Sequence, residues 1–113
     1  MHTPVLLLES LQALDIRPEG TYVDVTFGGG GHSRAILDRL QGGRLLAFDQ
    51  DPVAAQVASA IQDKRFTFIQ ANARFMHQFL AFHGVRQVDA NIADLEESSY
   101  QIDTAEQANS TRC

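Results

Sequence analysis

The chain has 113 residues, which is enough to bury one hydrophobic core but short for a complete α/β enzyme. Its net charge of −5 argues against the clustered positive charge with which proteins usually grip nucleic acid. The one cysteine, Cys113, excludes an internal disulfide, and no apolar run is long enough for a membrane span or a secretory signal. We therefore expect a cytoplasmic protein that does not enter a membrane.

Apolar spacing and turn residues predict helices and strands in alternation. Apolar residues at three-residue intervals predict an amphipathic helix between Pro4 and Leu14, closed by a turn over residues 17–20. The next strand begins at Tyr22. The further helices are predicted over residues 33–40, 52–62 and 75–84, and the further strands over 44–48, 66–69 and 88–95. Gly42 and Gly43 are predicted to cap the end of the second helix.

This alternation predicts an α/β fold. Strands that alternate with helices of about ten residues are joined by right-handed crossovers and form a parallel sheet. We expect the strand order 3-2-1-4 within a domain that covers residues 1–95. Residues 96–113 are polar and show no apolar period, so we expect this tail to be loop or disordered.

The stretch from Tyr22 to Ser33 predicts a strand that runs through a glycine turn into a helix. The glycines at 28–31 can adopt positive φ and let a ligand approach the backbone, and the helix start offers N–H groups. A glycine turn alone is also compatible with a flexible turn of no function. The pattern indicates a nucleotide-cofactor loop.

An acidic residue at the expected distance strengthens this interpretation. Asp49 ends an apolar run nineteen positions after Gly30, and in nucleotide-binding βαβ units an acid about 20 residues past the glycines binds ribose hydroxyls. The alternative for Asp49 is a helix cap, but Asp51 followed by Pro52 suits that role better. We assign Asp51 as the cap and Asp49 as the ribose ligand.

A doubly wound sheet binds its ligand at the carboxyl ends of its strands, near the point where the strand order reverses. In the predicted order this crevice lies between the first and fourth strands. Three acids are expected at this edge, namely Asp24, Asp49 and Asp94. A carboxylate-rich edge suits a cofactor with a cationic centre and ribose hydroxyls, such as S-adenosylmethionine, and no metal is expected.

Four segments of the chain form a pattern that is known from one family. They are His2–Leu7 with Glu9, Asp24–Ser33, Phe48–Pro52, and Ala93–Leu95 with Ser98–Gln101 and Asp103. In these segments the chain closely resembles the MraW family of bacterial 16S rRNA cytosine-N4 methyltransferases. Their order covers nearly the whole chain, and the Gly-Gly-His-Ser form of the loop is far more specific than a generic glycine turn.

The resemblance implies a partial class I, Rossmann-like fold that binds S-adenosylmethionine and methylates a cytidine of 16S rRNA. By position, Gly30, Gly31 and His32 would contact the methionine end of the cofactor and Asp49 the ribose. Asp94 and Gln101 would lie toward the adenine or the transfer region. His32 could instead only cap the helix, and Gln101 could simply be solvated.

The proposed chemistry requires a proton acceptor. The N4 amine of cytosine is a poor nucleophile because its lone pair is delocalised, so an enzyme must hold it in line and accept its proton. Asp94 is the candidate acceptor or orienting group. The alternative is that Asp94 only bonds nearby backbone N–H groups at the end of its strand.

Several departures from the family pattern argue for reduced activity. Asn91 stands where the strand should carry an aliphatic residue, and Glu96 stands where the family has glycine. Gln107-Ala-Asn109 likewise replaces an Arg-Gly-Phe motif. The family also has an aromatic near Ala73, and Phe75 could fill that space from two positions away.

The chain also stops well before the end of the family pattern. We expect a truncated methyltransferase with little or no turnover, whose fourth strand forms an exposed edge prone to self-association. Two rival interpretations are a non-catalytic cofactor-binding or structural fragment and an NAD-dependent oxidoreductase. Retained cofactor binding without activity would favour the first, and stabilisation by NAD but not by S-adenosylmethionine the second.

Overall fold

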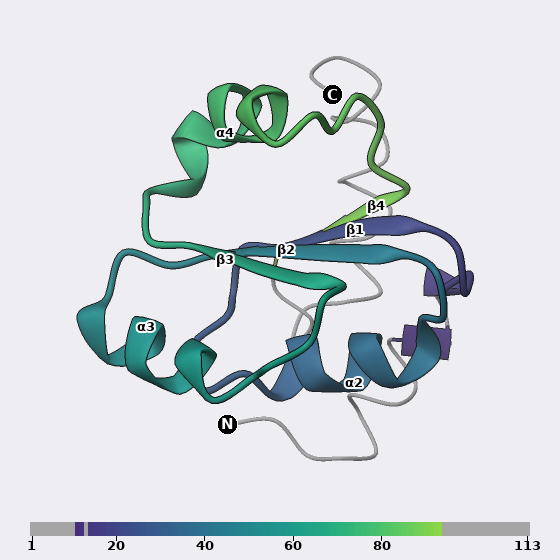
Figure 1. The fold of residues 1–113 in the computed structure, drawn as a ribbon, viewed down its shortest axis with the longest axis horizontal. Helices are drawn as coiled ribbons and strands as arrows, with labels where there is room; N and C mark the ends of the chain where they lie inside the picture. The colour runs from purple at the N-terminus through teal and green to yellow at the C-terminus, as the bar shows by residue number, and fades with distance from the viewer. Residues whose placement is uncertain (1–10, 13, 94–113) are drawn as a thin grey trace.

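A computed structural model describes residues 11, 12 and 14–93 (Figure 1). It contains a four-stranded parallel sheet in the order β3-β2-β1-β4. The strands are β1 (Thr21–Asp24), β2 (Arg44–Phe48), β3 (Phe66–Ile69) and β4 (Ala90–Ile92). The helical segments are α2 (Gly31–Arg39), α3 (Pro52–Ser59), the 3-10 turn η1 (Ala73–Phe75) and α4 (Met76–Phe82). The predicted fold class and strand order are confirmed.

The sheet is covered on both faces, with α2 and α3 on one side and α4 on the other (Figure 1). The apolar run Leu45–Phe48 of β2 follows from this arrangement, because a parallel strand that is buried on both faces carries apolar side chains on both of them. Leu45 and Ala47 pack with residues of α2 and α3, whereas Leu46 and Phe48 pack with Met76 and Leu80 of α4. The core is therefore divided by the sheet into two layers.

The strand register brings the carboxyl ends of the first three strands to one edge. Asp24, the last residue of β1, lies beside Ala47 of β2, and Ala47 lies beside Phe68 of β3. The segments that follow these strands carry the glycine turn, Asp49 and residues 70–73. The edge predicted to bind a ligand is thus formed within the described residues.

The predicted glycine cap of the second helix is wrong. α2 ends at Arg39, and its C-cap is Leu40 in an extended conformation. Gly42 and Gly43 do not have positive φ. A Cβ at Gly43 would lie 2.3 Å from the carbonyl oxygen of Gly20, so this glycine is required because two backbone segments touch.

Other predicted boundaries are confirmed or shortened. β2 and β3 match their predicted ranges, whereas α3 stops at Ser59 and β4 begins at Ala90 rather than Val88. Asp89, just before β4, is still bonded to β1: its backbone N–H donates to the Thr21 carbonyl at 2.7 Å, and its carboxylate accepts from the Thr21 N–H and from the guanidinium of Arg17, both within 2.8 Å. Most of the helix predicted between Pro4 and Leu14, and the whole of the tail 96–113, lie outside the described residues.

Candidate functional site

The glycine turn leaves β1 and enters α2 through two left-handed residues. Gly28 has φ +49° and Gly30 has φ +88°, a conformation that residues with a Cβ rarely adopt. The turn closes on itself through the Gly30 N–H, which donates to the carbonyl of Phe27 at 2.7 Å. Phe27 is buried beneath it among residues of α3. Two of the four glycines are therefore required by the backbone conformation.

The other two glycines have no structural requirement within the described residues. A Cβ at Gly29 or at Gly31 would meet no atom within 4 Å, and neither residue has positive φ. Open space at these positions leaves room for a group that approaches the backbone closely. The first turn of α2 has no side-chain cap, because its N-cap residue is Gly30, and an uncapped helix start favours a negatively charged ligand group.

A buried hydrogen-bond network fixes the turn from beneath, and it centres on Asp24. This carboxylate is fully buried and accepts from the Thr26 N–H at 2.8 Å, the Thr26 hydroxyl at 2.9 Å and the Ser33 hydroxyl at 2.7 Å. Asp24 lies at the carboxyl edge of the sheet as predicted, but its accepting capacity is directed at the turn and at α2. Asp24 holds the end of β1 against the start of α2.

His32 joins the same network and does not cap the helix. Its Nδ1 lies 3.1 Å from the Thr26 hydroxyl oxygen. Thr26 gives its only hydroxyl proton to Asp24, so the bond requires Nδ1 of His32 to donate. The imidazole is 4% exposed. His32 therefore lies under the turn with a fixed ring orientation.

Asp49 connects the glycine turn to the segment after β2. One carboxylate oxygen accepts from the Gly28 N–H at 3.0 Å, and the other accepts from the Asp51 N–H at 2.9 Å. Asp51 caps α3 by accepting from the Val53 N–H at 2.9 Å. The predicted division of roles is confirmed for Asp51, and Asp49 is left free of the helix cap with its orientation set by two backbone donors.

A hollow of about 210 Å³ opens at this edge of the sheet. It is lined by Val25, Phe48, Asp49, Gln50, Ala71, Asn72 and Ala73, which follow or end β1, β2 and β3. This hollow lies toward β2 and β3, whereas the predicted crevice between the first and fourth strands adjoins the segment after β4, which falls outside the described residues from residue 94 onward. Phe75 does not line the hollow and is 43% exposed, and its suggested replacement of an aromatic near Ala73 stays a prediction.

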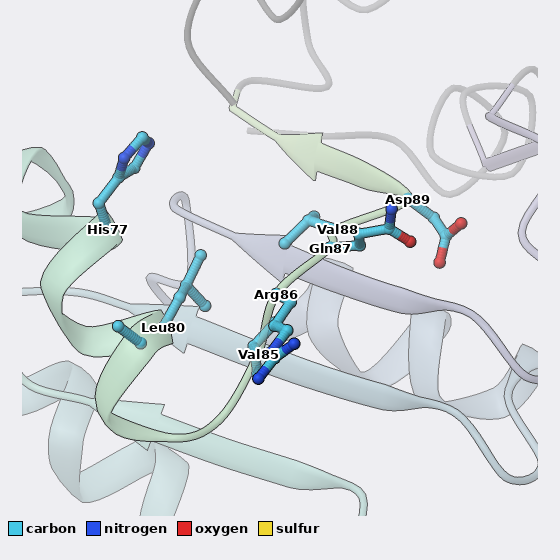
Figure 2. A pocket seen from close by; sticks show the side chains of 8 residues that line it. His77, Leu80, Val85, Arg86, Gln87, Val88 and Asp89 are labelled. Carbon is cyan, nitrogen blue, oxygen red and sulfur yellow. The ribbon is translucent and has the colours of Figure 1, made fainter.

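A larger hollow of about 430 Å³ lies between α4 and the segment that leads into β4 (Figure 2). Its lining includes Leu80, Val85, Arg86 and Asp89. These residues precede β4, so the hollow is at the opposite end of this strand from the ligand edge of the sheet. It does not include the glycine turn or Asp49, and we do not assign the cofactor site to it.

The structure brings together part of the predicted site. The glycine turn and Asp49 meet, and His32 lies directly beneath the turn, whereas Asp94 and Gln101 fall outside the described residues. Sequence reasoning missed the supporting roles of Thr26 and Ser33. An Asp-x-Thr pattern at the end of β1 was the available signal, since such residues bond backbone groups two positions on.

Two further observations concern the described residues alone. None of their helices is long and apolar enough to cross a membrane. In the same part of the chain, no group of three or more His, Cys, Asp or Glu residues is arranged to hold a metal ion.

Comparison with known proteins agrees with this geometry. The profile of the MraW methylase family matches residues 1–111. The chain is 59% identical over 111 residues to a ribosomal RNA small subunit methyltransferase H from Amoebophilus asiaticus, and 54% identical over 112 residues to one from Bacteroides fragilis. Each alignment covers 98% of this chain but only 36% of the relative's length.

A solved structure shares the fold at low identity. An rRNA methylase from Streptococcus thermophilus superimposes with a TM-score of 0.53 at 20% identity, over 70% of this chain and 49% of the other. The parallel sheet with its helices is therefore part of a Rossmann-like methyltransferase fold. With the family profile matching almost every residue, the chain belongs to the MraW methylase family.

Proposed function

We propose that this chain forms the S-adenosylmethionine-binding part of an rRNA methyltransferase of the cytoplasm, which modifies the exocyclic N4 of a cytidine in 16S rRNA. The observation that carries the proposal is the meeting of the glycine turn with Asp49 at the mouth of a hollow on the carboxyl edge of the sheet. Family membership and the names of the relatives support the reaction class.

The residues at this edge fit such a cofactor. Gly29 and Gly31 leave space for close approach to the backbone, and the uncapped start of α2 suits the carboxylate of a methionine moiety. Each Asp49 oxygen accepts one backbone N–H and retains a lone pair for a ribose hydroxyl. In this assignment Gly30, Gly31 and His32 form the methionine end of the site, and Asp49 binds the ribose.

The bound cofactor would supply an electrophilic methyl group. The chain must then orient the cytosine amine, exclude water and accept a proton. We assign the proton acceptor or orienting role to Asp94 and a supporting role to Gln101. Asp94 follows β4 by two residues, so the position of β4 governs where its carboxylate can reach.

We further propose that the 113-residue chain alone turns over slowly or not at all and can self-associate through β4. The chain spans 36% of the length of the relatives. Within the described residues, β4 pairs only with β1. The amide oxygen of Asn91 on β4 is buried and has no hydrogen-bond partner in that same part of the chain, which disfavours a well-packed strand. A cofactor-binding fragment without catalysis is therefore the second candidate function.

Isothermal titration of the purified chain with S-adenosylmethionine tests the proposal. Saturable binding that is weakened by Asp49→Ala, but not by Asp38→Ala on the exposed face of α2, is the expected result. A folded chain that binds neither S-adenosylmethionine nor its demethylated product would contradict it. Methyl transfer to small ribosomal subunits, measured in parallel, separates the catalytic interpretation from the binding fragment.

A further inference from the structure

An exposed arginine–aromatic pair directly follows the residues that line the hollow. The guanidinium carbon of Arg74 lies 4.9 Å from the centre of the Phe75 ring. Asn72 and Ala73 line the hollow, and η1 carries the chain from there to Phe75. The pair is therefore attached to the wall of the proposed cofactor site.

The backbone holds this pair in a fixed position. The Asn72 side chain accepts from the Arg74 N–H at 2.9 Å, and the Asn72 carbonyl accepts from the Phe75 N–H at 3.0 Å. The next residue, Met76, begins α4 and packs into the core with Leu46 and Phe48 of the sheet. A surface that is already ordered loses little conformational entropy when it binds a partner.

Among the described residues, the Arg74–Phe75 pair takes no part in the packing of the apolar core. Phe75 is 43% exposed and belongs to none of the apolar clusters of the core. Arg74 is exposed, and its guanidinium makes no ion pair with any residue that the structure describes. A planar cation on a planar ring thus remains available to a ligand.

We propose that Arg74 and Phe75 form a stacking platform for an unpaired base of single-stranded RNA. This inference rests on the proposed function, because it assigns the pair to the RNA substrate of the same site. Proteins bind splayed-out bases on aromatic rings and on arginine planes, and arginine N–H groups also bind phosphate. With a net charge of −5, the chain needs such a local contact more than a basic protein would.

The absence of tryptophan in the sequence allows a direct test. Phe75→Trp places the only indole of the chain on the platform, and Phe82→Trp provides a matched control at a position 82% exposed on α4. Each variant is titrated with a single-stranded oligocytidylate of about eight nucleotides, within the usual site size for single strands. We expect saturable quenching for Phe75→Trp and none for Phe82→Trp.

Two substitutions complete the test by fluorescence anisotropy of the labelled oligonucleotide. Phe75→Ala should weaken binding about fivefold to 100-fold, the usual effect of losing one base stack. Arg74→Ala should lower the slope of log affinity against log salt by about 0.7, the value for one phosphate on a single strand. Phe82→Ala and Arg86→Ala serve as matched controls and should change neither quantity.

Three outcomes would overturn the inference. They are no measurable binding of the oligonucleotide to the wild-type chain, equal quenching at positions 75 and 82, and a loss of self-association rather than RNA binding in Phe75→Ala. Titration of the same variants with S-adenosylmethionine distinguishes the two proposals. If the chain binds the cofactor but Phe75→Ala does not change the RNA affinity, only the stacking platform is refuted. If the wild-type chain does not bind the cofactor, the proposed site is refuted.

Discussion

Substitution of Asp24 provides the most demanding test of how the glycine turn is held. Asp24→Ala removes the acceptor of three hydrogen bonds at a fully buried position. Each buried donor left without a partner costs about 1–3 kcal/mol, and part of this cost is offset because a charge no longer has to be buried. We expect the free energy of unfolding to fall by about 3–5 kcal/mol, a large part of the total for a domain of this size.

Asp24→Asn should be much milder. Its amide oxygen can accept both bonds from Thr26, and its amide NH₂ can donate to the Ser33 hydroxyl, which is able to reverse its role. The loss is then the difference between charged and neutral hydrogen bonds, about 1–2 kcal/mol in total. Urea unfolding followed by circular dichroism at neutral pH measures both variants, with the exposed Asp38→Ala as the control. Equal losses in the two variants, or a loss below about 1 kcal/mol for Asp24→Ala, would refute the network.

Three further predictions follow from single residues. Gly31→Ala should leave the free energy of unfolding unchanged or raise it by less than about 1 kcal/mol, because the new Cβ meets open space at a helix start. The same substitution should weaken S-adenosylmethionine binding in a calorimetric titration. An unchanged affinity would show that the glycine turn is not part of the site. Asn91→Ile should stabilise the chain by about 1–3 kcal/mol, since the buried amide oxygen has no partner among the described residues. A melting temperature of the variant below that of the wild type would show that the amide is hydrogen-bonded in solution. Hydrogen bonds from the side chain and then the backbone of Arg65 lower the pKa of Asp63 from 3.8 to about 2, so its stabilising contribution is complete above pH 3.8 and is lost as the pH falls toward 2. The urea midpoint of Asp63→Asn should therefore lie below that of the wild type at neutral pH and meet it near pH 2, and a constant difference over this range would contradict the assignment.

The sequence allowed the sheet to be predicted because its signals are local. β2 and β3 are short apolar runs between turn residues, and their predicted ranges match the structure. The cap at Asp51 was also predictable, since an Asp-Pro pair marks a helix start by its own chemistry. Strand order followed from the regular alternation of strands and helices.

The features that were not predicted depend on contacts between distant segments. Gly43 was assigned to a helix cap, but its role is set by the approach of Gly20, which no local pattern reveals. Asp24 was correctly predicted at the carboxyl edge of the sheet, but the direction of its side chain depends on Ser33, nine residues away. Burial therefore distinguishes Asp24, which supports the glycine turn, from Asp49, which lines the hollow.

The short fourth strand gives the two halves of the proposed site different local stabilities. β4 has three residues and, in the part of the chain that the structure describes, a single neighbouring strand, whereas β1 and β2 lie inside the sheet. Amide hydrogens of β4 should therefore exchange with solvent through local opening, whereas those of β1 and β2 should exchange only through global unfolding. In the proposed assignment, cofactor recognition belongs to the slowly exchanging half, and Asp94 follows the quickly exchanging strand, so we expect mild denaturant to abolish substrate alignment before it releases the cofactor.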